Sequence, residues 1–102
     1  MKVSDIMAST EEYRNFILEQ LSIINNITYK PMMEKYLLYY KNKLFGEIYD
    51  DRLMIKKVDS NKIFNMEGNI SYKGAKLMYL VDNIDDSEKL RDIVLTTYKD
   101  LK

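Results

Sequence analysis

Apolar side chains recur at helical spacing in two parts of the chain, near its beginning and at its end. The first part predicts an amphipathic helix over residues 10–23, preceded by a capping box in which Ser9 caps the free backbone N–H groups and Glu12 reaches back. The second part predicts a final helix that begins near Asp85, with Glu88 three residues later. The inward-facing stripes are formed by Tyr13, Phe16, Ile17, Leu21 and Ile24 in the first helix and by Leu90, Ile93, Val94, Thr97, Tyr98 and Leu101 in the last.

Between these helices the pattern changes to short runs of β-branched and aromatic residues separated by polar turns, which is typical of strands. Five strands are predicted, at residues 27–33, 34–40, 44–49, 52–57 and 77–81. Pro31 places the first at a sheet edge or at a bulge, because proline has no N–H to donate. Turns are predicted at residues 41–43 and 50–51, and a short helix at residues 60–66, which Asp59 or Ser60 caps and Gly68 and Asn69 end. The fold class is therefore α+β: a two-layer domain with an antiparallel sheet of about five strands and with helices at the N-terminus, in the middle and at the C-terminus.

Both faces of the predicted sheet carry large side chains. Strict alternation separates Tyr36, Leu38 and Tyr40 from Leu37 and Tyr39, and Leu44, Gly46 and Ile48 from Phe45, Glu47 and Tyr49. We favour the interpretation that helices cover one face while tyrosines lie flat on the other with their hydroxyl groups in water. The alternative is that the side rich in aromatic residues and methionine is a contact surface for a second copy or a partner.

Composition removes several classes of chemistry. The 102 residues, the size of one domain, include no cysteine and no histidine, so the chain cannot form a Ser-His-Asp or Cys-His nucleophile system or a zinc–thiolate site. Lysine and arginine balance aspartate and glutamate at 16 each, so the chain lacks the basic footprint that usually accompanies nucleic-acid binding. No apolar run is long enough for a membrane span. Residues 1–8 are expected to be a flexible extension, with either Met1 or Met7 as the native start.

One stretch of the chain resembles a known family. Residues 29–33 (Tyr-Lys-Pro-Met-Met), residues 36–39 (Tyr-Leu-Leu-Tyr) and residues 46–52 (Gly-x-Ile-Tyr-Asp-Asp-Arg) are similar to the N-terminal domain of the TfoX (Sxy) competence-regulator family. Residues 72–76 and the later residues 80–82 resemble the family's second conserved block. The resemblance implies a secretion-chaperone-like, two-layer domain over residues 9–102 with a regulatory role, without the C-terminal helical domain that full-length competence regulators add. The chain differs from the family pattern where Lys30 replaces arginine and where Glu34, Asn42 and Glu47 replace glycine.

Three motifs are candidates for chemistry, and each has a purely structural alternative. Asp50 and Asp51 beside Arg52 can serve as an acid–base pair or bind a metal, but adjacent aspartates at a hairpin are first of all turn formers, and we favour the turn. The acidic cluster of residues 82–88 lacks the spacing of a calcium loop and is interpreted as helix capping. Residues 29–33 form either a docking strand or a bulged strand bent by Pro31 whose methionines fill the core, and both interpretations stay open.

Together these observations predict a non-enzymatic regulatory or protein-interaction module of the bacterial cytoplasm, with no cofactor, no metal and no membrane contact. The predicted partner is a protein or a second copy of the chain. The first alternative is a nucleic-acid-associated transcription regulator, because the family is linked to the control of competence. The second is a ligand-binding protein or an enzyme that uses carboxylates, tyrosines or lysines in a pocket between sheet and helices. The candidate interaction residues are Tyr29, Lys30, Pro31, Met32, Met33, Tyr36, Tyr39, Gly46, Tyr49, Asp50, Asp51, Arg52 and Gly74.

Overall fold

A computed structural model describes residues 10–69 and 76–102, and it confirms the predicted α+β class. Helix α2 (Glu11–Gln20) continues into a 3-10 turn, η1 (Leu21–Ile23), and helix α3 (Ser87–Tyr98) follows the last strand. A second 3-10 segment, η2 (Ser60–Phe64), occupies the middle of the chain. The strands are β1 (Ile27–Met32), β2 (Lys35–Tyr40), β3 (Lys43–Tyr49), β4 (Arg52–Ile55), β5 (Glu67–Asn69) and β6 (Met78–Val81).

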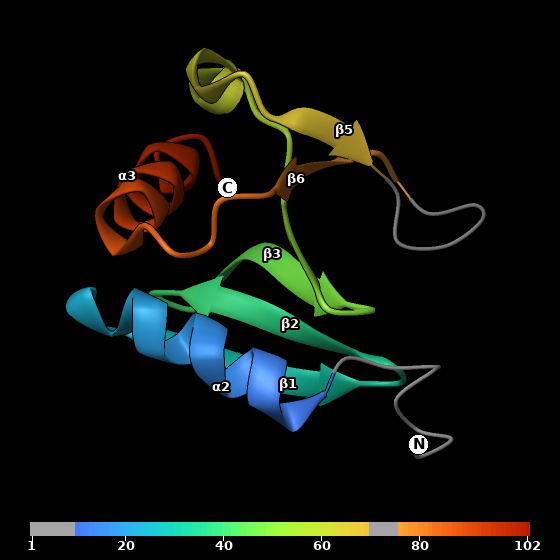
Figure 1. The fold of residues 1–102 in the computed structure, drawn as a ribbon. Coiled ribbons are helices and arrows are strands. Elements are labelled where there is room, and N and C mark those ends of the chain that lie inside the picture. The colour runs from blue at the N-terminus through green and yellow to red at the C-terminus, as the bar shows by residue number, and fades with distance from the viewer. Residues whose placement is uncertain (1–9, 70–75) are drawn as a thin grey trace.

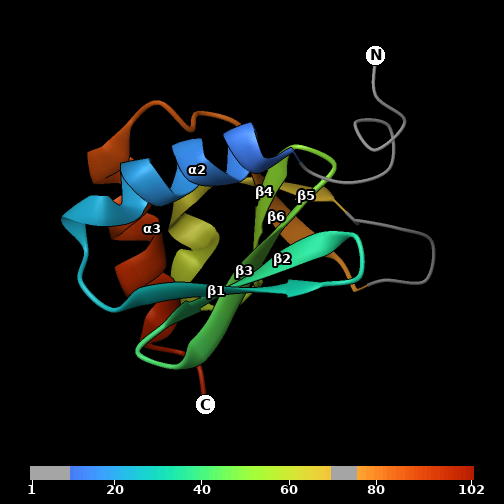
Figure 2. The same ribbon diagram turned by 90° about the horizontal axis from the view of Figure 1, so that it is seen from below.

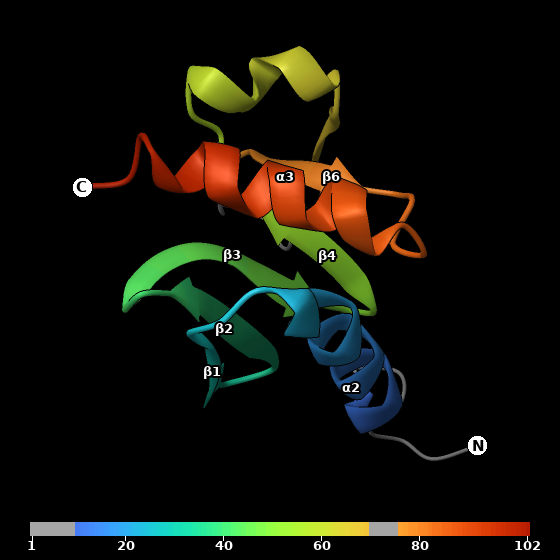
Figure 3. The same cartoon turned by 90° about the vertical axis from the view of Figure 1, so that its left-hand side faces the viewer.

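All described strands form one antiparallel sheet in the order β1-β2-β3-β4-β6-β5 (Figure 1). The helices α2 and α3 lie on the same side of this sheet, as Figures 2 and 3 show from two further directions. The core lies between the two layers and is formed by Ile17, Leu21, Ile24, Leu38, Tyr40, Phe45, Ile48, Leu53, Ile55, Val81, Leu90, Ile93 and Val94. We call the sheet surface that faces these helices the helix-covered face and the other surface the open face.

The sheet has one strand more than predicted. Gly68 and Asn69, expected to end the middle helix, instead lie in β5, where they pair with Tyr79 and Met78 of β6. The helix ends earlier than expected because Asn65 adopts a left-handed backbone with φ of 54°. Pairing with the next strand of the chain therefore overrides the local turn preference of the Gly-Asn pair.

Both long helices are capped as their sequences suggest, but each by the residue after the expected one. The hydroxyl of Thr10 accepts a hydrogen bond from the backbone N–H of Tyr13 at the start of α2. The predicted cap Ser9 and the extension at residues 1–8 lie outside the described residues. The carboxylate of Asp86, not that of Asp85, accepts from the N–H of Lys89 at the start of α3. The acidic cluster around residue 86 thus serves helix capping, as predicted.

Strand β3 contains a β-bulge that strict alternation misses. The pairing of β2 with β3 shifts between Leu38 and Tyr39, so that Phe45 and Gly46 together lie opposite Leu38. Phe45 is therefore on the helix-covered face, where it is fully buried, and Ile48 is buried there as well. The predicted separation of Phe45 from Ile48 was wrong, because the bulge adds one residue to the repeat of two.

Candidate functional site

The turn between β1 and β2 exposes two methionines. Met33 is 96% exposed and Met32 is 48% exposed, and the backbone of Met33 is left-handed with φ of 55°. A left-handed conformation is unfavourable for a large side chain and persists only where the surrounding structure holds it. Of the two interpretations of residues 29–33 that the sequence leaves open, the one in which these methionines fill the core was wrong, since both side chains are exposed.

Proline sits in this hairpin as an edge-strand residue. β1 is the outer strand of the sheet, and Pro31 pairs in register with Tyr36 of β2. The expected placement of Pro31 at an edge is therefore confirmed, whereas the bulge predicted as its alternative is found in β3 instead.

An open hollow lies beside the exposed methionines. It has a volume of about 870 Å³ and is lined by Met32, Met33, Glu34, Lys35 and Tyr49. We call these five residues the hairpin-tip surface. Apolar side chains gathered at an exposed and conformationally strained turn are typical of contact sites for other molecules.

The tyrosines of β1 and β2 divide between the two faces of the sheet. Tyr29 and Tyr36 lie on the helix-covered face, with ring centroids 5.8 Å apart in an edge-to-face arrangement. The guanidinium of Arg14 in α2 lies 4.9 Å from the Tyr29 centroid and 5.1 Å from that of Tyr36. These two candidate residues therefore join α2 to the sheet, while Tyr39, paired with Leu44, is on the open face.

The Asp50-Asp51 pair forms the turn that its composition predicts. Both residues have φ of 53°, and the flanking residues Tyr49 and Arg52 pair across the hairpin. The carboxylate of Asp51 accepts a hydrogen bond from the backbone N–H of Thr10 at 2.9 Å, which ties the turn to the start of α2. This hydrogen bond gives Asp51 a structural role, because it fixes the start of α2 beside the turn.

Two titratable side chains near this turn have further contacts. Burial raises the pKa of the Tyr13 hydroxyl, the negative charge of Asp51 raises it further, and a hydrogen bond with the backbone of Leu53 acts against both.

Nη1 of Arg52 lies 3.4 Å from the side-chain oxygen of Asn69 in β5, so this guanidinium reaches along the open face toward the far edge of the sheet.

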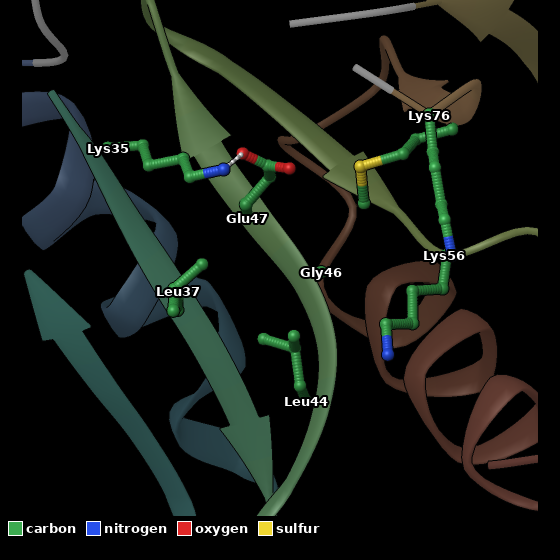
Figure 4. Close-up of a pocket in the computed structure, with 8 residues that line it drawn as sticks. Lys35, Leu37, Leu44, Gly46, Glu47, Lys56 and Lys76 are labelled. Carbon is green, nitrogen blue, oxygen red and sulfur yellow. Dashed lines mark ion pairs between the residues drawn. The ribbon is translucent and has the colours of Figure 1, made fainter. Parts of the chain in front are cut away.

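A second, smaller hollow lies in the middle of the open face. It has a volume of about 240 Å³ and is lined by Lys35, Leu37, Leu44, Gly46, Glu47, Lys56, Lys76 and Met78 (Figure 4). Nζ of Lys35 and Oε2 of Glu47 form an ion pair at 3.3 Å, with side chains only 18% and 10% exposed. We call this site the central hollow.

The central hollow is the part of the open face that sequence reasoning missed. Its residues come from β2, β3, β6 and the segments beside β4 and β6, and their proximity depends on strand register. The acidic residue Glu47 inside a largely apolar strand was the signal that could have indicated it. Of the remaining candidates, Lys30 pairs with Leu37 on the open face, Gly46 is in the bulge, and Gly74 lies outside the described residues.

Two kinds of feature are absent from residues 10–69 and 76–102. No three carboxylates there come close enough together to hold a metal ion. In the same part of the chain, no helix has the length and apolar character needed to cross a bilayer.

The fold and its open face define an α+β protein with a one-sided helix layer, and sequence comparison adds one relative. An uncharacterized 12.7 kDa protein in the trpE 5′ region of Spirochaeta aurantia is 27% identical over 94 residues, which span 89% of this chain and 82% of that protein. No family model matches the chain, and no solved structure matches it.

Proposed function

We propose that this protein is a non-enzymatic regulatory module of the bacterial cytoplasm that binds a protein partner or a second copy of itself through the hairpin-tip surface. The observation that carries the proposal is the exposure of Met32 and Met33 beside Tyr49 at the rim of an open hollow. Burial of such side chains against a partner removes apolar area from water, which contributes roughly 25 cal/mol per Å² before the entropic costs of association are subtracted.

The chemistry of the surface suits a protein partner. Methionine is flexible and polarizable, so a methionine pair adapts to irregular apolar surfaces. Tyr49 adds an aromatic anchor and Glu34 adds a negative charge, while the ammonium group of Lys35 is paired with Glu47. A surface without an excess of positive charge favours a protein over a nucleic acid, whose phosphates require a cationic footprint.

The resemblance of residues 29–33 and 46–52 to the TfoX N-terminal domain supports a regulatory role, and the absence of cysteine fits a reducing compartment. Within these motifs, the residues that support binding are Met32, Met33 and Tyr49, which belong to the hairpin-tip surface. Tyr29, Tyr36 and Asp51 contribute to the fold instead, because their contacts go to α2 or to its first turn.

The test is affinity capture from native cells with three forms of the protein. The first is the unaltered chain, the second carries Met32→Gln and Met33→Gln, and the third carries Ile63→Gln as a matched control. Ile63 is 73% exposed and lies in η2, far along the chain from the hairpin, so its replacement removes one exposed apolar side chain at an unrelated site.

We expect the unaltered chain and the Ile63 variant to recover the same specific protein, and the double methionine variant to lose most of it. For self-association, sedimentation at micromolar concentration should show a dimer that only the methionine variant disrupts. Capture of no specific protein together with a strictly monomeric chain would contradict the proposal, as would equal capture by all three forms.

A further inference from the structure

The central hollow owes its existence to the β-bulge in β3. Because Phe45 and Gly46 both belong to the helix-covered side of the bulge, the next open-face residue after Leu44 is Glu47, three positions along the strand instead of two. One side chain is thus missing from the middle of the open face. The space that this side chain would have filled forms part of the hollow, and the backbone of Gly46 lines it.

The hollow combines an apolar floor with an excess of positive charge. Leu37, Leu44 and Met78 supply the apolar lining. The one carboxylate among its eight described lining residues, Glu47, is already paired with Lys35. Lys56 and Lys76 form no ion pair with any described residue, so this part of the chain supplies no counter-charge for their two ammonium groups. Figure 4 shows both lysines on the opposite side of Gly46 from the Lys35–Glu47 pair.

We propose that the central hollow binds a small amphipathic carboxylate, with its apolar body over Leu37, Leu44 and Met78 and its carboxylate at the ammonium groups of Lys56 and Lys76. A purely apolar ligand would leave both ammonium groups without a counter-charge. A purely ionic one would leave the apolar floor exposed to water.

The size of the hollow limits the ligand. A volume of about 240 Å³ corresponds to roughly eight waters at the density of the liquid, and it is smaller than typical sites for drug-sized molecules. The ligand is therefore the size of a single amino acid or a short aryl acid. Contacts of this extent on an open surface give dissociation constants in the millimolar range.

The experiment uses 4-phenylbutyrate as the anionic probe and 4-phenyl-1-butanol as its neutral counterpart, titrated into the full chain with methyl-labelled leucine and methionine. Binding is followed by NMR through the methyl signals of Leu37, Leu44 and Met78. We expect these signals to move with the carboxylate, and the alcohol to bind about 3–10-fold more weakly, since each exposed ion pair is worth little on its own.

Substitutions at the lysines test whether their charges hold the carboxylate. The double change Lys56→Gln and Lys76→Gln should weaken carboxylate binding to the level of the alcohol, whereas Lys99→Gln, at an exposed lysine that does not line the hollow, should leave it unchanged. The Met32→Gln and Met33→Gln protein should bind the probe normally, so failure of the hairpin-tip proposal leaves this one standing. Equal affinity for both probes, shifts confined to other methyl groups, or no shift at tens of millimolar would each overturn it.

Discussion

Replacement of Gly46 by alanine tests the geometry of the bulge on which the central hollow depends. A methyl group built on Gly46 would lie 2.4 Å from the backbone oxygen of Met54 and 3.1 Å from Cδ1 of Ile55. The isoleucine methyl can rotate away, but the Met54 oxygen belongs to β4, which is held between β3 and β6. To reach even 3.0 Å, the new methyl group and this oxygen would have to separate by about 0.6 Å.

The expected loss of stability follows from this clash. Overpacking at a well-packed site costs roughly 1–3 kcal/mol, and the reduced flexibility of the unfolded chain offsets about 0.4–1 kcal/mol of it. We therefore expect a net destabilisation of about 1–2 kcal/mol, which corresponds to a fall in Tm of about 4–8 °C per kcal/mol for a domain of this size. The hydrogen bond from the N–H of Lys56 to the oxygen of Phe45, now 2.9 Å long, is the first to lengthen.

The assay is urea unfolding monitored by circular dichroism, with Gly68→Ala as the matched control. At Gly68 the new methyl group would meet only the side chain of Leu77 at 3.2 Å, and Leu77 is 51% exposed and can move aside. The control should therefore stay within about 0.5 kcal/mol of the unaltered protein. If Gly46→Ala unfolds at the same urea concentration as Gly68→Ala, Gly46 of β3 does not lie as close to the backbone of Met54 in β4 as the structure shows.

Three further changes test the contacts that hold the helices in place. Asn61→Ala should lower the free energy of unfolding by about 2 kcal/mol in denaturant titrations. The fully buried amide of Asn61 donates to the backbone oxygen of Lys56 and accepts from the backbone N–H of Val58. An unchanged free energy of unfolding would refute this role. Asp51→Asn should keep the turn but lower the pKa of Tyr13, measured by NMR titration, because the carboxylate charge raises that pKa; an unchanged pKa would contradict the contact. Hydrogen bonds from Ser60 hold the pKa of Asp100 below its usual value, so their contribution is present above the unfolded-state pKa of about 3.9 and is lost as the pH falls through the folded-state value. Asp100→Asn should therefore flatten the dependence of stability on pH in that acidic range, and an unaltered dependence would argue against it.

The elements that the sequence predicts well are those with a local cause. The two helices follow from 3.6-residue periodicity, and the Asp50-Asp51 turn follows from the tolerance of aspartate for positive φ. The buried stripe of α3 is confirmed at Leu90, Ile93 and Val94.

The elements that the sequence did not predict have causes in the pairing of two strands, which a single local segment does not reveal. β5 forms because β6 offers it a partner, so the local turn signal of Gly68 could not reveal it. The bulge at Phe45 and Gly46 is a property of the pairing of two strands and not of one. The ion pair of Lys35 with Glu47 crosses from β2 to β3, and its existence depends on that same register.

The candidate residues divide for the same reason. A motif read along the chain places Tyr29 to Met33 in one group, but the pleat sends alternate residues to opposite faces. Tyr29, although 40% exposed, therefore contacts Arg14 of α2, whereas Met32 and Met33 line the hollow at the hairpin tip. Resemblance to a family indicates which stretch is notable, and the sheet then decides which of its side chains another molecule can contact.

The most direct test of the proposed interaction is photo-crosslinking in living cells with a benzophenone amino acid in place of Met33, compared with the same replacement of Ile63. Both positions are highly exposed, so both substitutions should leave the fold intact. We predict one defined covalent adduct, to a single partner or to a second copy of the chain, from position 33 and none from position 63. The same adducts from both positions, or none from position 33, would contradict a binding role for the hairpin tip.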